Sequence, residues 1–355
     1  MGALHNVLSG RRMSSSQTKE HTMKKQFQQL LAIGSIAIAA FGAVSTANAF
    51  PLTLTAAGTG LGFTLSTVVS SLSGGTPNCC HVLGSAVNSA GQIIVNNAGN
   101  STNYLFANVD NQVGPGAAIS STPAFGFPIA MANAGGNVYA GGGNLRKLNN
   151  DGSVAATYSD INISLGMWTN TVNQHLIAVG SFSGGSGLID IDVSGALPSV
   201  RLINGAFSDG LTVSPDGTIV YTNDAAYRIS DGVLLASYFV PGADGMGVIT
   251  SGNALNGDII VSTTGGKLVL LDPLMGFAQT VIADFGGYGD FTSPDFTTGT
   301  LLVSSGDYLM RLGCGQGCGV GSAPPPGVPE PSALWLAALG LLGLARVRMT
   351  RRAKV

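Results

Sequence analysis

The stretch GLTVSPDGTIVYTN, residues 210–223, places two short apolar runs on either side of a four-residue turn. Ser214-Pro215-Asp216-Gly217 favours a turn, because proline presets the backbone and glycine accepts a left-handed conformation. The flanking runs are rich in Val, Ile, Leu and Thr, which is typical of strands. Further strands are predicted at residues 227–230 and 232–239. The stretch from 210 to 239 is therefore predicted to form four antiparallel strands.

The same pattern, a turn with Gly or Asn followed by an apolar strand, occurs six times. The copies begin at residues 91, 136, 173, 217, 257 and 299, so they lie 45, 37, 44, 40 and 42 residues apart. A period near forty built from short strands is typical of a β-propeller, in which each repeat is a four-stranded blade. The sequence predicts an all-β fold with a single six-bladed β-propeller over residues 50–312. A seven-bladed propeller and a β-sandwich are the alternatives.

The last repeat supplies only three strands, at residues 290–293, 300–304 and 308–312. An isolated strand at Phe63–Leu72 has the pattern of the outer strands. We expect it to provide the missing fourth strand, because an open blade would expose unpaired backbone groups.

Four cysteines flank the repeats, with Cys79 and Cys80 before the first and Cys314 and Cys318 after the last. Cysteines of an exported chain are normally paired. Bridges between the two pairs would lock the closed ring. The alternatives are a local Cys314–Cys318 bridge and a soft-metal site at Cys79-Cys80-His81, of which the metal site is disfavoured in an oxidising compartment.

Both ends of the chain carry targeting patterns. Lys24 and Lys25, an apolar run at 30–44 and the small residues Ala47 and Ala49 predict a signal peptide over 23–49, cleaved before Phe50. Residues 1–22 are interpreted as a non-native upstream extension or a long n-region.

At the other end, a Gly/Pro linker at 313–327 leads into Val328-Pro329-Glu330-Pro331. An apolar stretch at 333–345 and a basic cluster follow, which predicts a short transmembrane helix. Thirteen residues reach about 20 Å, less than the roughly 30 Å of a bilayer core. We interpret the segment 328–355 as a temporary anchor.

This C-terminal segment resembles the PEP-CTERM sorting signal of Gram-negative bacteria. The resemblance implies recognition by an exosortase-type membrane protease, cleavage near Pro329-Glu330-Pro331, and transient anchoring in the inner membrane. It further implies delivery to the cell surface or an exopolysaccharide matrix. An ordinary C-terminal anchor is the alternative.

The repeats carry resemblances of their own. The Ser214–Asn223 stretch is similar to lactonase-like propeller repeats with a Ser-Pro-Asp-Gly turn followed by Tyr-Val-Thr-Asn, here Val220-Tyr221-Thr222-Asn223. The copy at 135–139 resembles kelch repeats. Lactonase-type hydrolases hold a divalent metal with a ligand set that typically includes glutamate, and residues 50–327 contain none.

Composition excludes several classes of function. Residues 50–327 hold sixteen Asp and six basic residues, a net charge of −10, which disfavours nucleic acid as a partner. The lack of glutamate excludes paired-glutamate chemistry and His-Glu-x-x-His metal sites. Only His81 and His175 remain in this region, and no Gly-x-Ser-x-Gly elbow occurs.

Asp209, Asp244 and Asp290 each precede a predicted innermost strand and are expected at one mouth of a central channel. Facing carboxylates could hold Ca²⁺ or a polar ligand, and no other cofactor is expected. Because Asp beside Gly is a common turn former, the turn interpretation is favoured for the Asp209-Gly210 and Asp244-Gly245 pairs.

Four apolar side chains at the starts of inner strands favour plain packing within the blades, with a ligand-stacking side of the same mouth as the alternative. They are Phe125, Phe127, Met167 and Trp168. Asp190 and Asp192 alternate along a strand and predict a solvated face.

Together these patterns predict an exported, non-catalytic binding or structural module that meets a polysaccharide or a surface protein. A metal-dependent lactonase or hydrolase with an Asp-lined mouth is the alternative.

Overall fold

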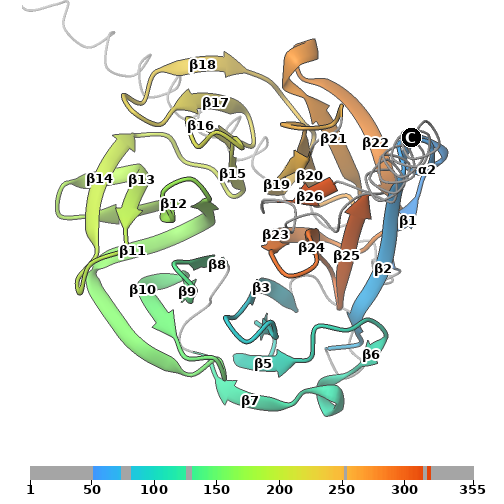
Figure 1. Cartoon of the computed structure of the whole chain (residues 1–355), viewed down its shortest axis with the longest axis horizontal. Helices are drawn as coiled ribbons and strands as arrows, with labels where there is room; N and C mark the ends of the chain where they lie inside the picture. The colour runs from blue at the N-terminus through green and yellow to red at the C-terminus, as the bar shows by residue number, and fades with distance from the viewer. Residues whose placement is uncertain (1–50, 73–80, 125–129, 252–253, 315–317, 321–355) are drawn as a thin grey trace, which may run out of the picture. The chain divides into compact units, whose positions relative to one another are not determined.

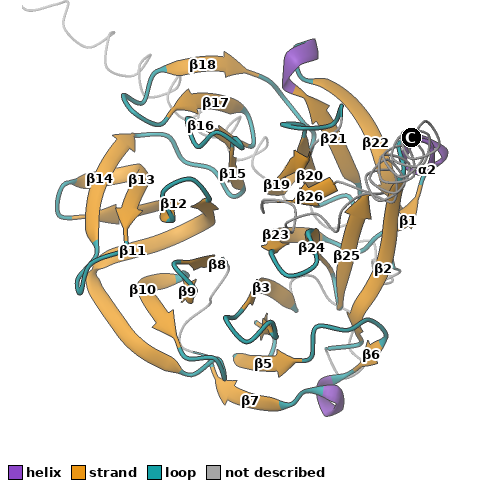
Figure 2. Ribbon diagram, in the orientation of Figure 1, coloured by secondary structure: helices purple, strands orange, loops and turns teal. Residues whose placement is uncertain are grey.

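A computed structural model describes residues 51–72, 81–124, 130–251, 254–314 and 318–320 (Figure 1). All of them belong to one compact unit, Asn48–Val355. The described chain is almost entirely strand, with one short helix, α2 (Ala56–Gly60), and two 3₁₀ turns, η1 (Pro115–Ala117) and η2 (Pro273–Met275) (Figure 2). The all-β prediction is confirmed. The predicted signal helix and C-terminal helix lie outside the described residues, and within these residues no helix has the length and apolarity needed to cross a membrane.

Two sheets contain four antiparallel strands each, in chain order. The first consists of β3 (Val82–Val87), β4 (Ile93–Asn97), β5 (Thr102–Phe106) and β7 (Ser120–Pro123). The second consists of β15 (Leu211–Val213), β16 (Ile219–Thr222), β17 (Ala225–Arg228) and β18 (Leu234–Ser237).

The second of these sheets is the predicted four-stranded unit, but its third strand begins at Ala225 and ends at Arg228. Ser230 lies beyond that strand in a turn, where the backbone N–H of Gly232 donates to the carbonyl of Arg228 at 2.8 Å and that of Val233 to the carboxylate of Asp231 at 3.2 Å.

A seven-stranded sheet is built around β11 (Val154–Asn170), whose length is unusual for this chain. The early part of β11 pairs with β10 as far as Ile163, and its later part pairs with β12 from Ile161 to Asn170, with a register irregularity between Ile163 and Met167. The other strands are β8 (Met131–Ala134), β9 (Asn137–Ala140), β10 (Gly143–Leu148), β12 (His175–Phe182), β13 (Gly185–Asp192) and β14 (Ser199–Asn204). One strand therefore ends one four-stranded group and begins the next.

The remaining strands form an eleven-stranded sheet with two groups. One contains β19 (Ala243–Ser251), β20 (Ile259–Thr263), β21 (Leu268–Asp272) and β22 (Ala278–Asp284), with β1 (Thr53–Leu54) on β22. The other contains β23 (Gly289–Asp295), β24 (Thr300–Ser305), β25 (Tyr308–Cys314) and β2 (Phe63–Ser70), with β6 (Gln112–Val113) on β2. The short strand β26 (Cys318–Val320) joins the groups by pairing with β19 and β25.

The pairing of β2 with β25 confirms the prediction that the early strand completes the last repeat. The two strands run antiparallel, with Leu65 opposite Leu312. Neighbouring bonds strengthen the junction, because Leu72 donates from its backbone N–H to the carbonyl of Asp307 at 3.4 Å, and Val82 to that of Gly306 at 3.3 Å. The early strand β2 and the late strand β25 are thereby tied together.

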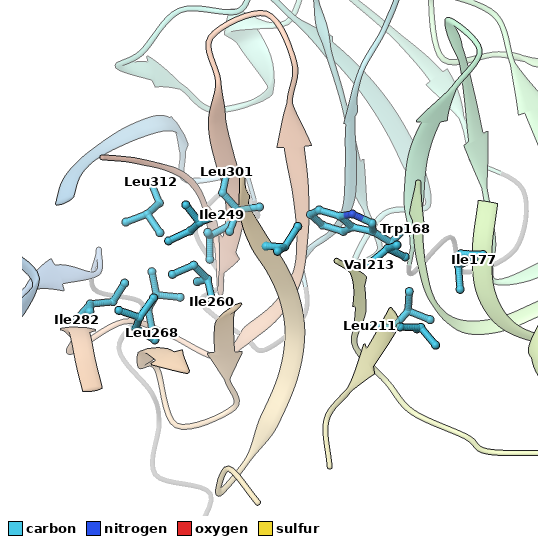
Figure 3. Packing of buried hydrophobic residues seen from close by; sticks show 14 of the residues in the cluster. Trp168, Ile177, Leu211, Val213, Ile249, Ile260, Leu268, Ile282, Leu301 and Leu312 are labelled. Carbon is cyan, nitrogen blue, oxygen red and sulfur yellow. The ribbon is translucent and has the colours of Figure 1, made fainter. Parts of the chain in front are cut away.

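The groups are arranged around a common centre, with β3, β8, β15, β19 and β23 nearest to it and β7, β14, β18, β22 and β2 farthest out (Figure 1). Apolar side chains fill the spaces between neighbouring groups; Trp168 of β11, for example, lies beside Val213 of β15 (Figure 3). Strands that are apolar on both faces require such cover on both sides. Each fully buried Leu, Ile or Val contributes about 1.5–3 kcal/mol.

Candidate functional site

Asp244 and Asp290 lie in irregular starts of inner strands. The register of β19 against β20 shifts between Ala243 and Met246, and that of β23 against β24 between Gly289 and Thr292. A bulge of this kind re-aims a side chain away from the regular alternation of the strand. Both aspartates are therefore placed by a local departure from strand geometry on neighbouring inner strands.

Close packing between backbones brings the aspartate-bearing segments together. A Cβ atom built on Gly210 would lie 1.6 Å from the carbonyl oxygen of Asp244, and one on Gly245 would lie 2.0 Å from that of Asp290. Only a residue without a side chain allows this approach. The favoured turn interpretation is wrong for Asp244-Gly245, which lies inside β19, and neither glycine has a positive φ. The glycines serve the contact between neighbouring groups.

The carboxyl groups are buried and act on one another. Asp244 is 5 % exposed and Asp290 is 7 % exposed, whereas Asp209, just before β15, is exposed. Burial, and secondarily the charge of Asp209, raises the pKa of Asp244 to about 7. Burial, followed by the charges of Asp244 and Asp209, raises the pKa of Asp290 to about 8. The charge of Asp209 thus acts on both buried carboxyl groups and that of Asp244 on Asp290, in agreement with the close contact of their backbones.

Tyr288, immediately before β23, faces the same group of acids. Its pKa is raised by burial and by the charges of Asp244, Asp290 and Asp209. The phenol therefore stays protonated at neutral pH and can donate a hydrogen bond.

Neither buried carboxylate has a partner among the described residues. No hydrogen bond or ion pair of the described chain reaches the side chain of Asp244 or Asp290, and neither holds an oxygen that is both enclosed and unpaired. Buried carboxylates are ordinarily paired, because removing an unpaired charge from water is costly. Two carboxyl groups without partners, each still in contact with solvent, mark a candidate binding site.

Asn223, directly after β16, adds a further unpaired acceptor beside them. Its Nδ2 donates to the carbonyl oxygen of Ala243 at 3.0 Å, which fixes the orientation of the amide. Its Oδ1 is enclosed and accepts no hydrogen bond. A Cβ on Gly210 would lie 2.9 Å from this Oδ1, so the atom lies between the Asp209 and Asp244 segments.

The arrangement gives no support to a metal centre. Over the described ranges, no three His, Cys, Asp or Glu side chains are arranged to hold a metal ion. The alternative interpretation of Asp209, Asp244 and Asp290 as a Ca²⁺ site thus stays a prediction.

A second polar cluster was missed in the sequence. Asp190 on β13 is only 9 % exposed, and its two carboxylate oxygens contact Nδ1 of His175 at 2.8 Å and Nη2 of Arg201 at 2.9 Å. The predicted solvated face is therefore wrong at this residue, because β13 lies between β12 and β14 and both neighbours cover it. Asp192 remains partly exposed. The opposed positions of Asp190 and Arg201 in the ladder were the available signal.

Arg311 forms another cluster that the sequence did not reveal. Its Nε donates to Asp110 at 2.9 Å, and its Nη1 contacts Asp295, which is completely buried. Burial alone would raise the pKa of Asp295, but hydrogen bonds from Thr297, Thr298, Asn108 and Arg311 hold that pKa below its ordinary value. The cluster ties β23 and β25 to the segment after β5 and is structural.

The remaining candidate residues are apolar side chains and cysteines, and some of them lie outside the described residues. Met167 and Trp168 are 4 % and 2 % exposed and lie in hydrophobic clusters, so plain packing accounts for them. Cys314 is disulfide-bonded, while Cys79 and Cys80 lie outside the described residues, as do Phe125 and Phe127. The side chain of Cys318 is not described either, so the connectivity remains a prediction.

The radial arrangement of four-stranded antiparallel groups defines a β-propeller protein. Its fold is similar to that of a gluconolactonase from Xanthomonas campestris, with a TM-score of 0.50 and 12% sequence identity over 76% of this chain and 96% of that one. A virginiamycin B lyase from Staphylococcus aureus is also similar, with a TM-score of 0.44 and 12% identity over 70% of this chain and 99% of that one. At such identities the likeness concerns the fold alone.

The C-terminal residues give the more specific match. Residues 327–352 match the PEP-CTERM protein-sorting motif, which confirms the resemblance seen in the sequence. The motif implies export, anchoring and sorting through the C-terminus in Gram-negative bacteria, and processing by an exosortase-type membrane protease. A comparison with functionally characterised proteins finds no match in sequence.

Proposed function

We propose that the strands form six blades and that the ring is an exported binding module. The blade count rests on dividing the seven-stranded sheet within β11 and the eleven-stranded sheet at β26, where each sheet passes from one four-stranded group to the next. The propeller domain then spans residues 50–312, followed by the linker at 313–327.

The proposed route begins with removal of the signal peptide 23–49 after Ala49. The segment 328–355 then holds the chain in the inner membrane until cleavage near Pro329-Glu330-Pro331 releases it to the cell surface or an exopolysaccharide matrix. Mass spectrometry of the protein recovered from the cell surface tests this route. The expected species begins at Phe50 and ends near Pro331; a species that retains the C-terminal arginines contradicts the cleavage.

We assign ligand binding, without catalysis, to the site at Asp209, Asp244 and Asp290. One observation carries this assignment: two buried carboxyl groups on adjacent inner strands have no partner and retain contact with solvent. Such groups are costly to bury, and a ligand that supplies the missing hydrogen bonds or charge recovers that cost.

Glycan binding tests the assignment. The full chain, purified in detergent, is applied to a glycan array beside the double variant Asp244→Asn/Asp290→Asn and the exposed-site control Asp160→Asn. We expect binding that the double variant loses and the control keeps. An array on which the parent chain binds nothing would instead support a purely structural matrix component.

A hydrolase is the second candidate, and the pKa values of about 7 and about 8 favour it. A general acid or base works best when its pKa is close to the operating pH. The metal-dependent form requires stoichiometric Ca²⁺ that Asp244→Ala abolishes, together with turnover of a lactone or ester. Metal analysis and an esterase assay on the same preparations separate this candidate from the binding module.

A further inference from the structure

Every unpaired group at the site is a hydrogen-bond acceptor or becomes one on ionisation. The carboxyl groups of Asp244 and Asp290 and Oδ1 of Asn223 lack partners, and the exposed carboxyl of Asp209 lies beside them. The phenol of Tyr288, whose pKa is raised by burial and by the charges of the three aspartates, is a donor beside them. A complementary ligand must therefore bring several donors and a positive charge.

Two kinds of cation meet this requirement differently. Ca²⁺ draws its oxygen ligands to about 2.3–2.6 Å and needs six to eight of them. An ammonium group donates three N–H bonds to acceptors at about 2.7–2.9 Å, so three carboxylates can surround it at a wider spacing. Asp209, Asp244 and Asp290 supply three carboxyl groups on segments whose backbones are in close contact. Three acceptors are enough for the three N–H bonds of an ammonium group, whereas Ca²⁺ needs more oxygen ligands, so the site favours the donor-rich cation.

We propose that Asp209, Asp244 and Asp290 bind the primary ammonium group of a small molecule, each carboxylate accepting one N–H. Asn223 is the independent sign of an incomplete site, since its enclosed Oδ1 beside Gly210 also lacks a donor. The inference rests on the proposed binding function and names the class of its ligand.

Binding of the cation displaces protons from the buried pair. Near neutral pH, Asp244 and Asp290 are partly protonated, because burial disfavours their ionisation, as do the charge of Asp209 on both and that of Asp244 on Asp290. The titratable groups that face them are Asp209 and Tyr288, and the phenol stays neutral over this range. The affinity for an ammonium ion therefore rises as the pH rises through the range in which the pair ionises.

Isothermal titration calorimetry of the full chain in detergent tests the proposal with methylammonium chloride. Titration in buffers of different ionisation enthalpy counts the protons that are released. We expect at least a tenfold lower dissociation constant at pH 8.5 than at pH 6, with release of roughly one proton near pH 7.5. Asp290→Asn should raise the dissociation constant at pH 8.5 at least tenfold, whereas Asp160→Asn should leave it unchanged.

Two comparison cations give the refuting outcomes. Tetramethylammonium carries the same charge without an N–H group, and equal affinity for it would overturn the hydrogen-bonded ammonium site. Tight stoichiometric Ca²⁺ that methylammonium does not displace would assign the aspartates to a metal. Aspartate-dependent glycan binding without methylammonium binding would overturn this inference alone and leave the binding module standing.

Discussion

Replacing Asp290 by asparagine should make the protein more stable at alkaline pH. The side chain keeps its size and loses a charge that is 7 % exposed and lacks a partner among the described residues. Its pKa is about 8 in the folded protein, against an ordinary value of 3.8 that applies to the unfolded chain. Between these values the folded state holds a proton that the unfolded state has lost. The parent protein therefore loses stability as the pH rises from 4 to 8, and the loss levels off above that.

The magnitude follows from the same two pKa values. At about 1.36 kcal/mol per pH unit, the interval from 3.8 to about 8 corresponds to about 6 kcal/mol as an upper limit. Solvent relaxation around a site in contact with water reduces this limit, so we expect Asp290→Asn to gain about 2–4 kcal/mol at pH 9. Asp244 is not counted separately, because its charge is one of the causes that raise the pKa of Asp290. At pH 5 both folded side chains are neutral and only the unfolded aspartate has ionised, so the same calculation gives at most about 1.6 kcal/mol and, after the same reduction, a difference of about 1 kcal/mol or less.

Thermal and urea unfolding at pH 5, 7 and 9, followed by circular dichroism, measures the difference. A gain of 2–4 kcal/mol corresponds to a rise in Tm of very roughly 5–10 °C at pH 9. Asp160→Asn, at an exposed position, should follow the parent protein at every pH. The reasoning is refuted if the parent protein is as stable at pH 9 as at pH 5, or if Asp290→Asn brings no gain at pH 9 while the control behaves as expected. Asp258, whose pKa is raised to about 6, contributes equally to all three proteins and cancels.

Three further substitutions probe the packing and closure of the fold. Gly245→Ala places a Cβ 2.0 Å from a backbone oxygen of β23 and should cost more than about 2 kcal/mol in urea unfolding, whereas Gly205→Ala, with nothing within 4 Å, should change stability by less than about 1 kcal/mol. Arg311→Met leaves the fully buried Asp295 without its counter-ion and should lower the free energy of unfolding by about 3–5 kcal/mol. Arg228→Met removes the exposed ion pair with Asp231 and should cost less than about 1 kcal/mol, so similar losses in the two variants would contradict the buried cluster. Cys314→Ser should cost about 5 kcal/mol if its disulfide closes the ring and about 2 kcal/mol if it closes a local turn, and non-reducing peptide mapping identifies the bridge directly.

The sequence was sufficient for the strands and their closure because both depend on local patterns. Alternation of short apolar runs with Gly- and Asp-containing turns predicted the order of strands, and the missing fourth strand of the last repeat pointed to Phe63–Leu72, now β2. Boundaries were less certain, as the early end of β17 at Arg228 shows, because the carbonyl of Arg228 already accepts the turn hydrogen bond from Gly232.

The site was predicted only in part, because its decisive features are contacts between repeats. Asp209, Asp244 and Asp290 were identified from their place before inner strands, but the burial of Asp244 and Asp290 depends on backbones from other groups. The glycine after Asp244 suggested a turn, whereas it permits contact with the next inner strand. Asp190 was misjudged for the same reason: alternation along one strand does not reveal which neighbours cover it.

The union of β2 with β25 also determines when the protein can finish folding. β2 is synthesised early but pairs with β25, which lies far along the chain. Thr67 and Met310, which are in contact, are 243 residues apart. Such long-range pairing forms slowly, so a chain passing through a translocation pore cannot pair β2 with β25 before the later strand is available. Truncation before Tyr308 would leave β2 unpaired, with an exposed edge that favours aggregation. Cleavage in a surface loop would leave the two fragments held together by the pairing of β2 with β25. The ring of strands therefore stays open until β25 is available, and the pairing of β2 with β25 then joins its two ends.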